Sequence, residues 1–165
     1  MVWRKKMNQK SLSKWLKIIL AGTALCGLVV YCFVIPECGK SLIASYPEFS
    51  NRYWPWLVFI WVSGLPCYAV LVLGWMIASN IGRDKSFSGE NARYMKIIAW
   101  LAAGDSIYFF MGNVALLFLN MSHPGVALLF MIVVFAGAAV AIAAAVLSRL
   151  IRKAAGLQEQ SDLTI

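Results

Sequence analysis

The fold is decided by residues 125–148, whose sequence is GVALLFMIVVFAGAAVAIAAAVLS and contains no charged side chain. About 20 apolar residues in a helix cross the ~30 Å hydrocarbon layer of a bilayer, so this run predicts a membrane span. The span extends over about residues 125–149, and three more charge-poor runs occupy residues 17–36, 54–81 and 96–120. We therefore predict an all-α membrane protein, a bundle of four transmembrane helices.

The composition of the whole chain agrees with this fold class. Of its 165 residues, 61% are hydrophobic and 13% are charged, and the mean hydropathy is +0.74. Soluble domains are roughly 45–50% apolar and about 25% charged, so a soluble globular fold is excluded. The connections are too short to fold as separate catalytic or DNA-binding domains. Residues 1–165 are therefore predicted to form a single integral membrane domain.

The positions of Lys and Arg predict the orientation of the chain. Thirteen of the fifteen precede the first span, separate the second from the third, or follow the fourth, whereas Lys40 and Arg52 lie elsewhere. By the positive-inside rule, both termini, a loop at residues 82–95 and a tail at residues 150–165 are cytoplasmic, and residues 37–53 form an outer loop. The net charge of +8 is then a topology signal, and direct binding to nucleic acid is not expected.

Cysteine and histidine are too scattered to predict a metal site or a catalytic group. The four Cys and one His form no C-x-x-C or H-x-x-H spacing, and Cys26, Cys32 and Cys67 lie inside spans, where small apolar packing residues are expected. His123 has no acidic neighbour in the sequence to make a general base with a partner. We expect no cofactor, no metal and no enzymatic activity.

Asp105 is the one ionisable side chain well inside a predicted span. An Asp at the centre of a span costs about 2.5–3.5 kcal/mol on insertion scales, so it should face the bundle interior, find hydrogen-bond partners or be protonated. Tyr108 and Asn113, three and eight residues further on, share its helical face. The stripe predicts either a proton or cation site of a small transporter or immunity-type protein, or an interhelical hydrogen bond to Thr23, Ser63, Tyr68 or a neighbouring subunit.

The predicted cytoplasmic loop has the residues of a helix-to-helix turn. Gly82 can end one helix, and Ser88 can cap the N-terminus of the next, with Glu90 in its first turn. A plain turn is one interpretation. The other is a docking surface for a cytosolic partner, with Phe87 as its apolar point and Glu90 and Asn91 beside it.

The C-terminal tail keeps a helical apolar pattern beyond the fourth span, through Leu150 to Leu157. It then ends in Asp162, Leu163, Thr164 and Ile165, which form either a frayed end or a recognition peptide for a partner. Small residues four apart in the fourth span pack internally or form the contact of a homo-oligomer; they are Gly137, Ala141 and Ala145.

Two of these segments resemble one known family. The sequence GRDKSFSGENA at residues 82–92 and the ending QEQSDLTI at residues 158–165 are similar to the corresponding parts of domain of unknown function 2975. The resemblance implies a four-span protein of a bacterial cell membrane, with the lipid bilayer as its surroundings and no established activity. It also implies a genetic context, because such proteins are often encoded beside a small helix-turn-helix transcriptional regulator.

Together with the exposed character expected for the loop and the tail, this genetic context favours a non-enzymatic interaction or regulatory protein. Its loop and tail would contact a cytosolic partner such as that regulator. The alternative is the small transporter or immunity-type protein that uses Asp105, a residue that matches no motif of the family.

Overall fold

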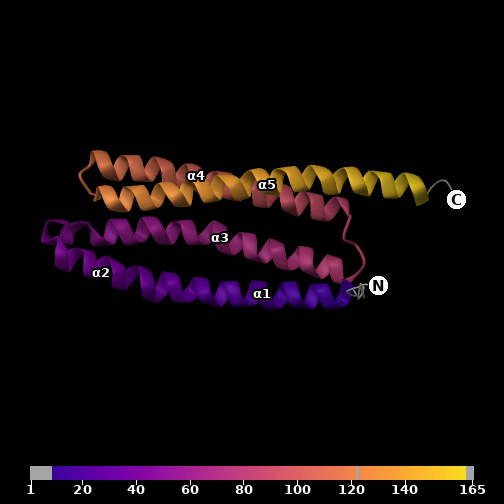
Figure 1. Cartoon of the computed structure of the whole chain (residues 1–165), viewed down its shortest axis with the longest axis horizontal. Coiled ribbons are helices and arrows are strands. Elements are labelled where there is room, and N and C mark those ends of the chain that lie inside the picture. The colour runs from indigo at the N-terminus through magenta and orange to yellow at the C-terminus, as the bar shows by residue number, and fades with distance from the viewer. Residues whose placement is uncertain (1–8, 122, 163–165) are drawn as a thin grey trace, which may run out of the picture.

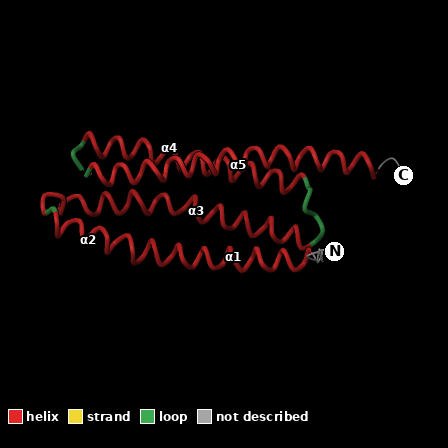
Figure 2. Tube along the Cα trace, in the orientation of Figure 1, coloured by secondary structure: helices red, strands yellow, loops and turns green. Residues whose placement is uncertain are grey.

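The computed structural model describes residues 9–121 and 123–162, and this part of the chain is built from helices and short connections (Figure 1 and Figure 2). The elements are, in chain order, α1 (Gln9–Val29), the π-helix η1 (Val30–Val34), α2 (Ile35–Ser45), the 3-10 helix η2 (Pro47–Arg52), α3 (Tyr53–Gly82), α4 (Gly89–Phe118) and α5 (Pro124–Asp162).

Within the described residues, four helices are long and apolar enough to cross a membrane, in agreement with the predicted number of spans. They are Gln9–Ser45, in which α1, η1 and α2 form one continuous helix, and Ser50–Gly82, Gly89–Phe118 and Pro124–Gln160. Both termini and the connection between α3 and α4 lie at one end of the molecule (Figure 1). We call this the basic end, since it holds Lys10, Lys14, Lys17, Arg83, Lys85, Arg93, Lys96, Arg149, Arg152 and Lys153.

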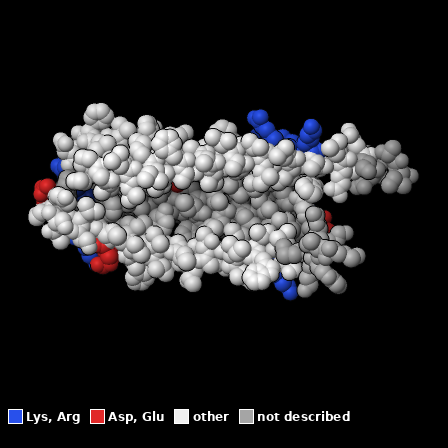
Figure 3. All heavy atoms as spheres, in the orientation of Figure 1, with Lys and Arg blue, Asp and Glu red and all other residues white. Residues whose placement is uncertain are grey.

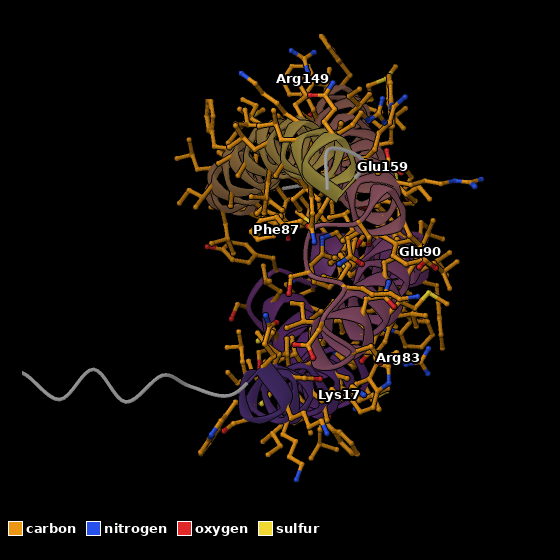
Figure 4. The ribbon with its side chains drawn as sticks, turned by 90° about the vertical axis from the view of Figure 1, so that its right-hand side faces the viewer. Lys17, Arg83, Phe87, Glu90, Arg149 and Glu159 are labelled. Atoms are coloured by element: carbon orange, nitrogen blue, oxygen red, sulfur yellow. The ribbon has the colours of Figure 1, made fainter. Side chains whose placement is uncertain are left out.

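The four long helices form an open row rather than a closed bundle. α1 packs along α3, α3 along α4, and α4 along α5, with the most extensive packing between the last two. Within the described residues, α5 and α1 share no comparable contact that would close a ring, and the view along the helices shows an arc (Figure 4). Lipid is as apolar as a helix surface, so close packing arises where small or polar residues allow it and not from burial of apolar area.

Polar groups and a cation hold α1 against α3. Ser13 Oγ donates to the carbonyl of Ala78 at 2.6 Å. Tyr68 OH donates to the carbonyl of Ala24 at 3.0 Å. Between these two hydrogen bonds along α1, Lys17 Nζ lies 5.2 Å from the centre of the Trp75 ring.

Small and polar residues also join α4 to α5. Ser148 Oγ donates to the carbonyl of Ala92 at 2.6 Å. A Cβ added at Gly137 would collide with Ser106 Oγ, and Ala141 is 8% exposed. Gly137 and Ala141 therefore serve internal packing between these two helices, whereas Ala145, the third residue of the predicted stripe, is exposed.

The segment predicted as an outer loop, residues 37–53, is helical over most of its length, in α2 and η2. Pro36 does not end the helix; it lies at the start of α2, which directly follows the π-helix η1, and the backbone stays helical through Val34 and Ile35 into α2. Arg52 at the end of η2 donates from its guanidinium to the carbonyls of Leu119 and Asn120 at the end of α4. This contact ties the segment to the turn between α4 and α5.

Candidate functional site

Asp105 lies on α4 beside α3, and its hydrogen-bond partner there is Cys67. The Sγ atom of Cys67 donates toward Asp105 Oδ2 at a distance of 4.0 Å. The expectation that Cys67 is only a small apolar packing residue is therefore corrected. A thiol is a weak donor, so this carboxylate has less compensation than a hydroxyl or a cation would give.

The three hydroxyls predicted as partners of Asp105 donate elsewhere, so this choice of partners was wrong, although the bond from Cys67 does join two helices. Thr23 Oγ1 donates to the carbonyl of Ile19 at 2.9 Å, within its own helix. Ser63 Oγ donates to the carbonyl of Ile60 at 2.8 Å. Tyr68 reaches α1, as described above. In an apolar surrounding each hydroxyl pairs with a backbone carbonyl, which leaves the thiol beside the carboxylate.

The π-helix η1 extends this polar region toward α1. Tyr31 lies in η1, with its hydroxyl 3.3 Å from Ser63 Oγ, and its carbonyl accepts a hydrogen bond from Trp61 Nε1 at 3.0 Å. Its ring packs on Gly64, where an added Cβ would lie 3.2 Å from the ring edge. Short π-helical turns occur frequently at functional sites. Neither Tyr31 nor Cys67 was predictable as a site residue from residue spacing.

A cavity of about 220 Å³ lies beside Asp105 between α3 and α4. Its lining residues are Val62, Pro66, Trp100, Leu101, Gly104, Asp105 and Tyr108. Pro66 lies near the middle of α3, where that helix bends in Figure 1. The structure thus brings Asp105 and Tyr108 to one cavity, although the Tyr108 hydroxyl itself donates to the carbonyl of Phe59 at 3.0 Å.

Asn113 does not join this cavity. It is fully buried against α5, and its Nδ2 donates to the carbonyl of Ala127 at 3.0 Å. Eight residues rotate an α-helix by about 80° relative to the starting residue, so Asn113 faces the next helix along the row. The predicted stripe is therefore divided between two neighbours of α4. We call Asp105 and Tyr108 of α4, together with Tyr31 of η1 and Ser63 and Cys67 of α3, the polar cluster.

At the basic end, Asn91 organises the connection between α3 and α4. Ser88 Oγ accepts from the Asn91 N–H at 3.2 Å, which confirms Ser88 as the N-cap of α4. Asn91 Nδ2 donates to the carbonyls of Lys85 at 3.0 Å and Ser86 at 3.1 Å, and its Oδ1 accepts from Asn80 Nδ2 at 2.8 Å. Asn91 is 0% exposed, so it presents no surface to a partner.

Glu90 and Phe87 differ from Asn91 in their exposure. Glu90 accepts hydrogen bonds from Asn80 Nδ2 at 3.2 Å and from the Tyr94 hydroxyl at 2.6 Å. The bond to Glu90 raises the pKa of the Tyr94 hydroxyl above its usual value. Phe87 is 59% exposed. Of the loop residues predicted to contact a partner, Phe87 offers the largest apolar surface.

The last helix projects beyond the others at the basic end (Figure 1). α5 continues to Asp162, which confirms that the helix extends past the predicted span. Leu150 and Leu157 on this extension are 57% and 59% exposed. The side chain of Asp162 and all of Leu163, Thr164 and Ile165 lie outside the described residues.

These features define the class of protein as a multi-pass, all-helical membrane protein with a polar cluster between its spans. The model of the family described as protein of unknown function DUF2975 matches residues 37–165, and the chain belongs to this family. It is 30% identical over 161 residues to the uncharacterized membrane protein YoaS of Bacillus subtilis (strain 168). That match covers 96% of this chain and 100% of YoaS. No solved structure matches the chain.

Proposed function

We propose that this protein is a non-enzymatic interaction protein of a bacterial cell membrane that contacts a cytosolic partner at its basic end. In this proposal both termini and residues 82–95 are cytoplasmic, as the positive-inside rule requires when thirteen of the fifteen Lys and Arg precede the first span, separate the second from the third or follow the fourth in the sequence. The segments offered to the partner are the connection between α3 and α4 and the C-terminal extension of α5.

The observation that best supports this proposal is the length of α5. Its 39 residues measure roughly 58 Å at 1.5 Å per residue, about twice the ~30 Å hydrocarbon layer. Ser148 contacts Ala92 in the first turn of α4, so α5 passes the end of that helix about one turn after Ser148. A helix that leaves the membrane with exposed leucines is suited to recognition by a groove on another protein.

The connection between α3 and α4 supplies a second apolar point. Phe87 is exposed, whereas Asn91 is fully buried and bonded to the carbonyls of Lys85 and Ser86 in the same connection. Aromatic side chains, Phe among them, are enriched at the cores of protein–protein interfaces. In Figure 4, Phe87 lies on the concave side of the arc, below α5 in that view.

The partner that the family resemblance favours is a small helix-turn-helix regulator. Membrane binding would lower the concentration of free regulator in the cytosol. A change in how the four helices pack could regulate this binding. It does so only if the regulator binds the protein with different affinity before and after that change.

Deleting residues 158–165 is expected to abolish recruitment of this partner, because the deletion removes the end of the projecting helix and all of the terminal peptide. The measurement is crosslinked affinity purification from native membranes followed by mass spectrometry. Phe87→Ala should reduce recovery of the same small helix-turn-helix protein. Phe118→Ala is the matched control, since Phe118 is 84% exposed at the opposite end of α4. Equal recovery with the intact, shortened and Phe87→Ala chains would contradict the proposal.

A second candidate function is transport or sensing of a proton or cation, which the cavity beside Asp105 favours. Asp105→Asn is expected to reduce ion flux into liposomes to the rate of protein-free liposomes, because it removes the ionisable group of the polar cluster. An entrapped pH-sensitive dye reports the flux, and Glu37→Gln at the exposed end of the first span is the control. Unchanged flux with Asp105→Asn, at equal protein content, would exclude this function.

A further inference from the structure

A groove of about 670 Å³ follows the seam between α4 and α5 near the basic end. Its floor is made by small residues on both helices, with Ala99 and Ala103 on α4 and Ala141 and Ala145 on α5. Trp100 forms part of its wall and is 71% exposed. The short alanine side chains leave the seam recessed relative to longer lining residues such as Trp100 and Ile142.

The mouth of this groove is lined by four cations and no carboxylate. Lys96 lies on α4, and Arg149, Arg152 and Lys153 lie on α5. The ion pair found in the described part of the chain joins Lys40 to Glu37 at the opposite end. These four cations therefore have no acidic partner among residues 9–121 and 123–162, and Figure 3 shows Lys and Arg gathered over the later part of α5.

The position of the mouth along the helices identifies the level of the membrane surface. Lys96 immediately precedes the charge-poor part of α4, and Arg149 immediately follows the uncharged residues 125–148 of α5. The cations therefore lie where lipid headgroups begin, and the alanine floor lies where acyl chains begin. A soluble phosphate would contact the cations alone, whereas a lipid uses both parts of the groove.

We propose that this groove binds one anionic phospholipid of the leaflet at the basic end. Its phosphate lies among Lys96, Arg149, Arg152 and Lys153, and one acyl chain lies along the alanine floor beside Trp100. Basic pockets between transmembrane helices bind headgroups of this kind, and guanidinium groups match the geometry of phosphate oxygens.

This lipid site is separate from the surface proposed for a cytosolic partner. Arg149 and Arg152 occupy one face of α5, and Leu150 and Leu157 lie roughly 120° further round the same helix, with Lys153 between the two faces. In Figure 4, Arg149 points away from α5 on the side opposite to Phe87. Failure of partner recruitment would therefore leave the lipid site unaffected, and the reverse also holds.

The test is retention of lipid by the full-length protein, measured by native mass spectrometry after reconstitution with equal amounts of phosphatidylglycerol and phosphatidylcholine. The intact chain is expected to retain phosphatidylglycerol in preference. The triple variant Arg149→Gln, Arg152→Gln, Lys153→Gln should lower this retention about a hundredfold, from the usual contribution of a cation near an anionic membrane. The control triple variant Arg83→Gln, Lys85→Gln, Arg93→Gln removes the same charge at the same end of the molecule.

A charge-neutral pair of variants tests the floor of the groove and guards against misassembly of the triple variant. Ala145→Trp fills the groove and should abolish the preference for phosphatidylglycerol. Ala143→Trp, at an exposed position of α5 that does not line the groove, should retain the preference. Glycerol 3-phosphate added in excess should not displace the lipid.

Three results would overturn the proposal. The first is an equal loss of retention in the two triple variants, which indicates diffuse attraction to the whole basic end. The second is unchanged retention in Ala145→Trp. The third is displacement by glycerol 3-phosphate, which indicates a phosphate site without a lipid chain.

Discussion

Replacing Asn91 with alanine is expected to lower the free energy of unfolding by about 2–4 kcal/mol, the cost of leaving several buried polar groups unpaired. Asn91 is 0% exposed and joins both sides of the connection between α3 and α4. Its loss leaves the carbonyls of Lys85 and Ser86 without this donor and removes the 2.8 Å bond from Asn80. Thermal unfolding of the purified protein in a mild detergent measures the effect.

The matched control for this variant is Asn51→Ala, because Asn51 is an exposed asparagine in η2. Asn51→Ala is expected to change the free energy of unfolding by no more than about 0.5 kcal/mol. An equal shift of the unfolding temperature in the two variants would show that the hydrogen bonds of Asn91 do not stabilise the connection.

Gly112→Ala is expected to destabilise the protein by about 1–3 kcal/mol, the usual cost of forcing extra atoms into a packed interior. A Cβ at Gly112 would collide with the ring of Phe59 across the seam between α3 and α4. The centroid of the Phe59 ring lies 4.8 Å from that of Tyr108, on which it stacks, 5.4 Å from that of Phe109 and 6.2 Å from that of Phe130. The ring therefore has aromatic neighbours on several sides. The seam must open, or the aromatic group must rearrange.

Gly104→Ala in the same helix separates this collision from the intrinsic effect of alanine. An added Cβ at Gly104 meets no atom within 4 Å, and alanine favours a helix by about 1 kcal/mol over glycine. We therefore expect Gly104→Ala to leave the unfolding temperature unchanged or raise it, and Gly112→Ala to lower it. Equal shifts in the two variants would contradict the steric argument.

The parts of the fold that were predictable from the sequence are those set by local chemistry. A charge-free run such as residues 125–148 has one low-energy solution in a bilayer, because a helix satisfies all of its own backbone hydrogen bonds. Ser88 was identifiable as an N-cap because its side chain acts on an N–H three residues away. Neither inference depends on which helices are neighbours.

The polar cluster was not predictable because it depends on helix rotation and on which helices pair. Asp105 and Cys67 are 38 positions apart in the chain, and nothing in the apolar pattern of α3 indicates which of its faces meets α4. For the same reason the sequence did not predict that Asn113, which shares a helical stripe with Asp105, contacts α5 instead of α3. The π-helix around Tyr31 has no residue signature comparable with a cap or a turn.

The open row has a consequence for how this protein is held in shape. A closed bundle hides one side of every helix from lipid, whereas α3 and α4 here have neighbours on two flanks and two broad faces left to the bilayer. Lipid acyl chains must cover both of these faces. The lipid therefore takes the place that other helices would hold in a closed bundle. The thickness and chain order of the surrounding lipid therefore act directly on the spacing of α3 and α4, and Asp105 lies on that seam.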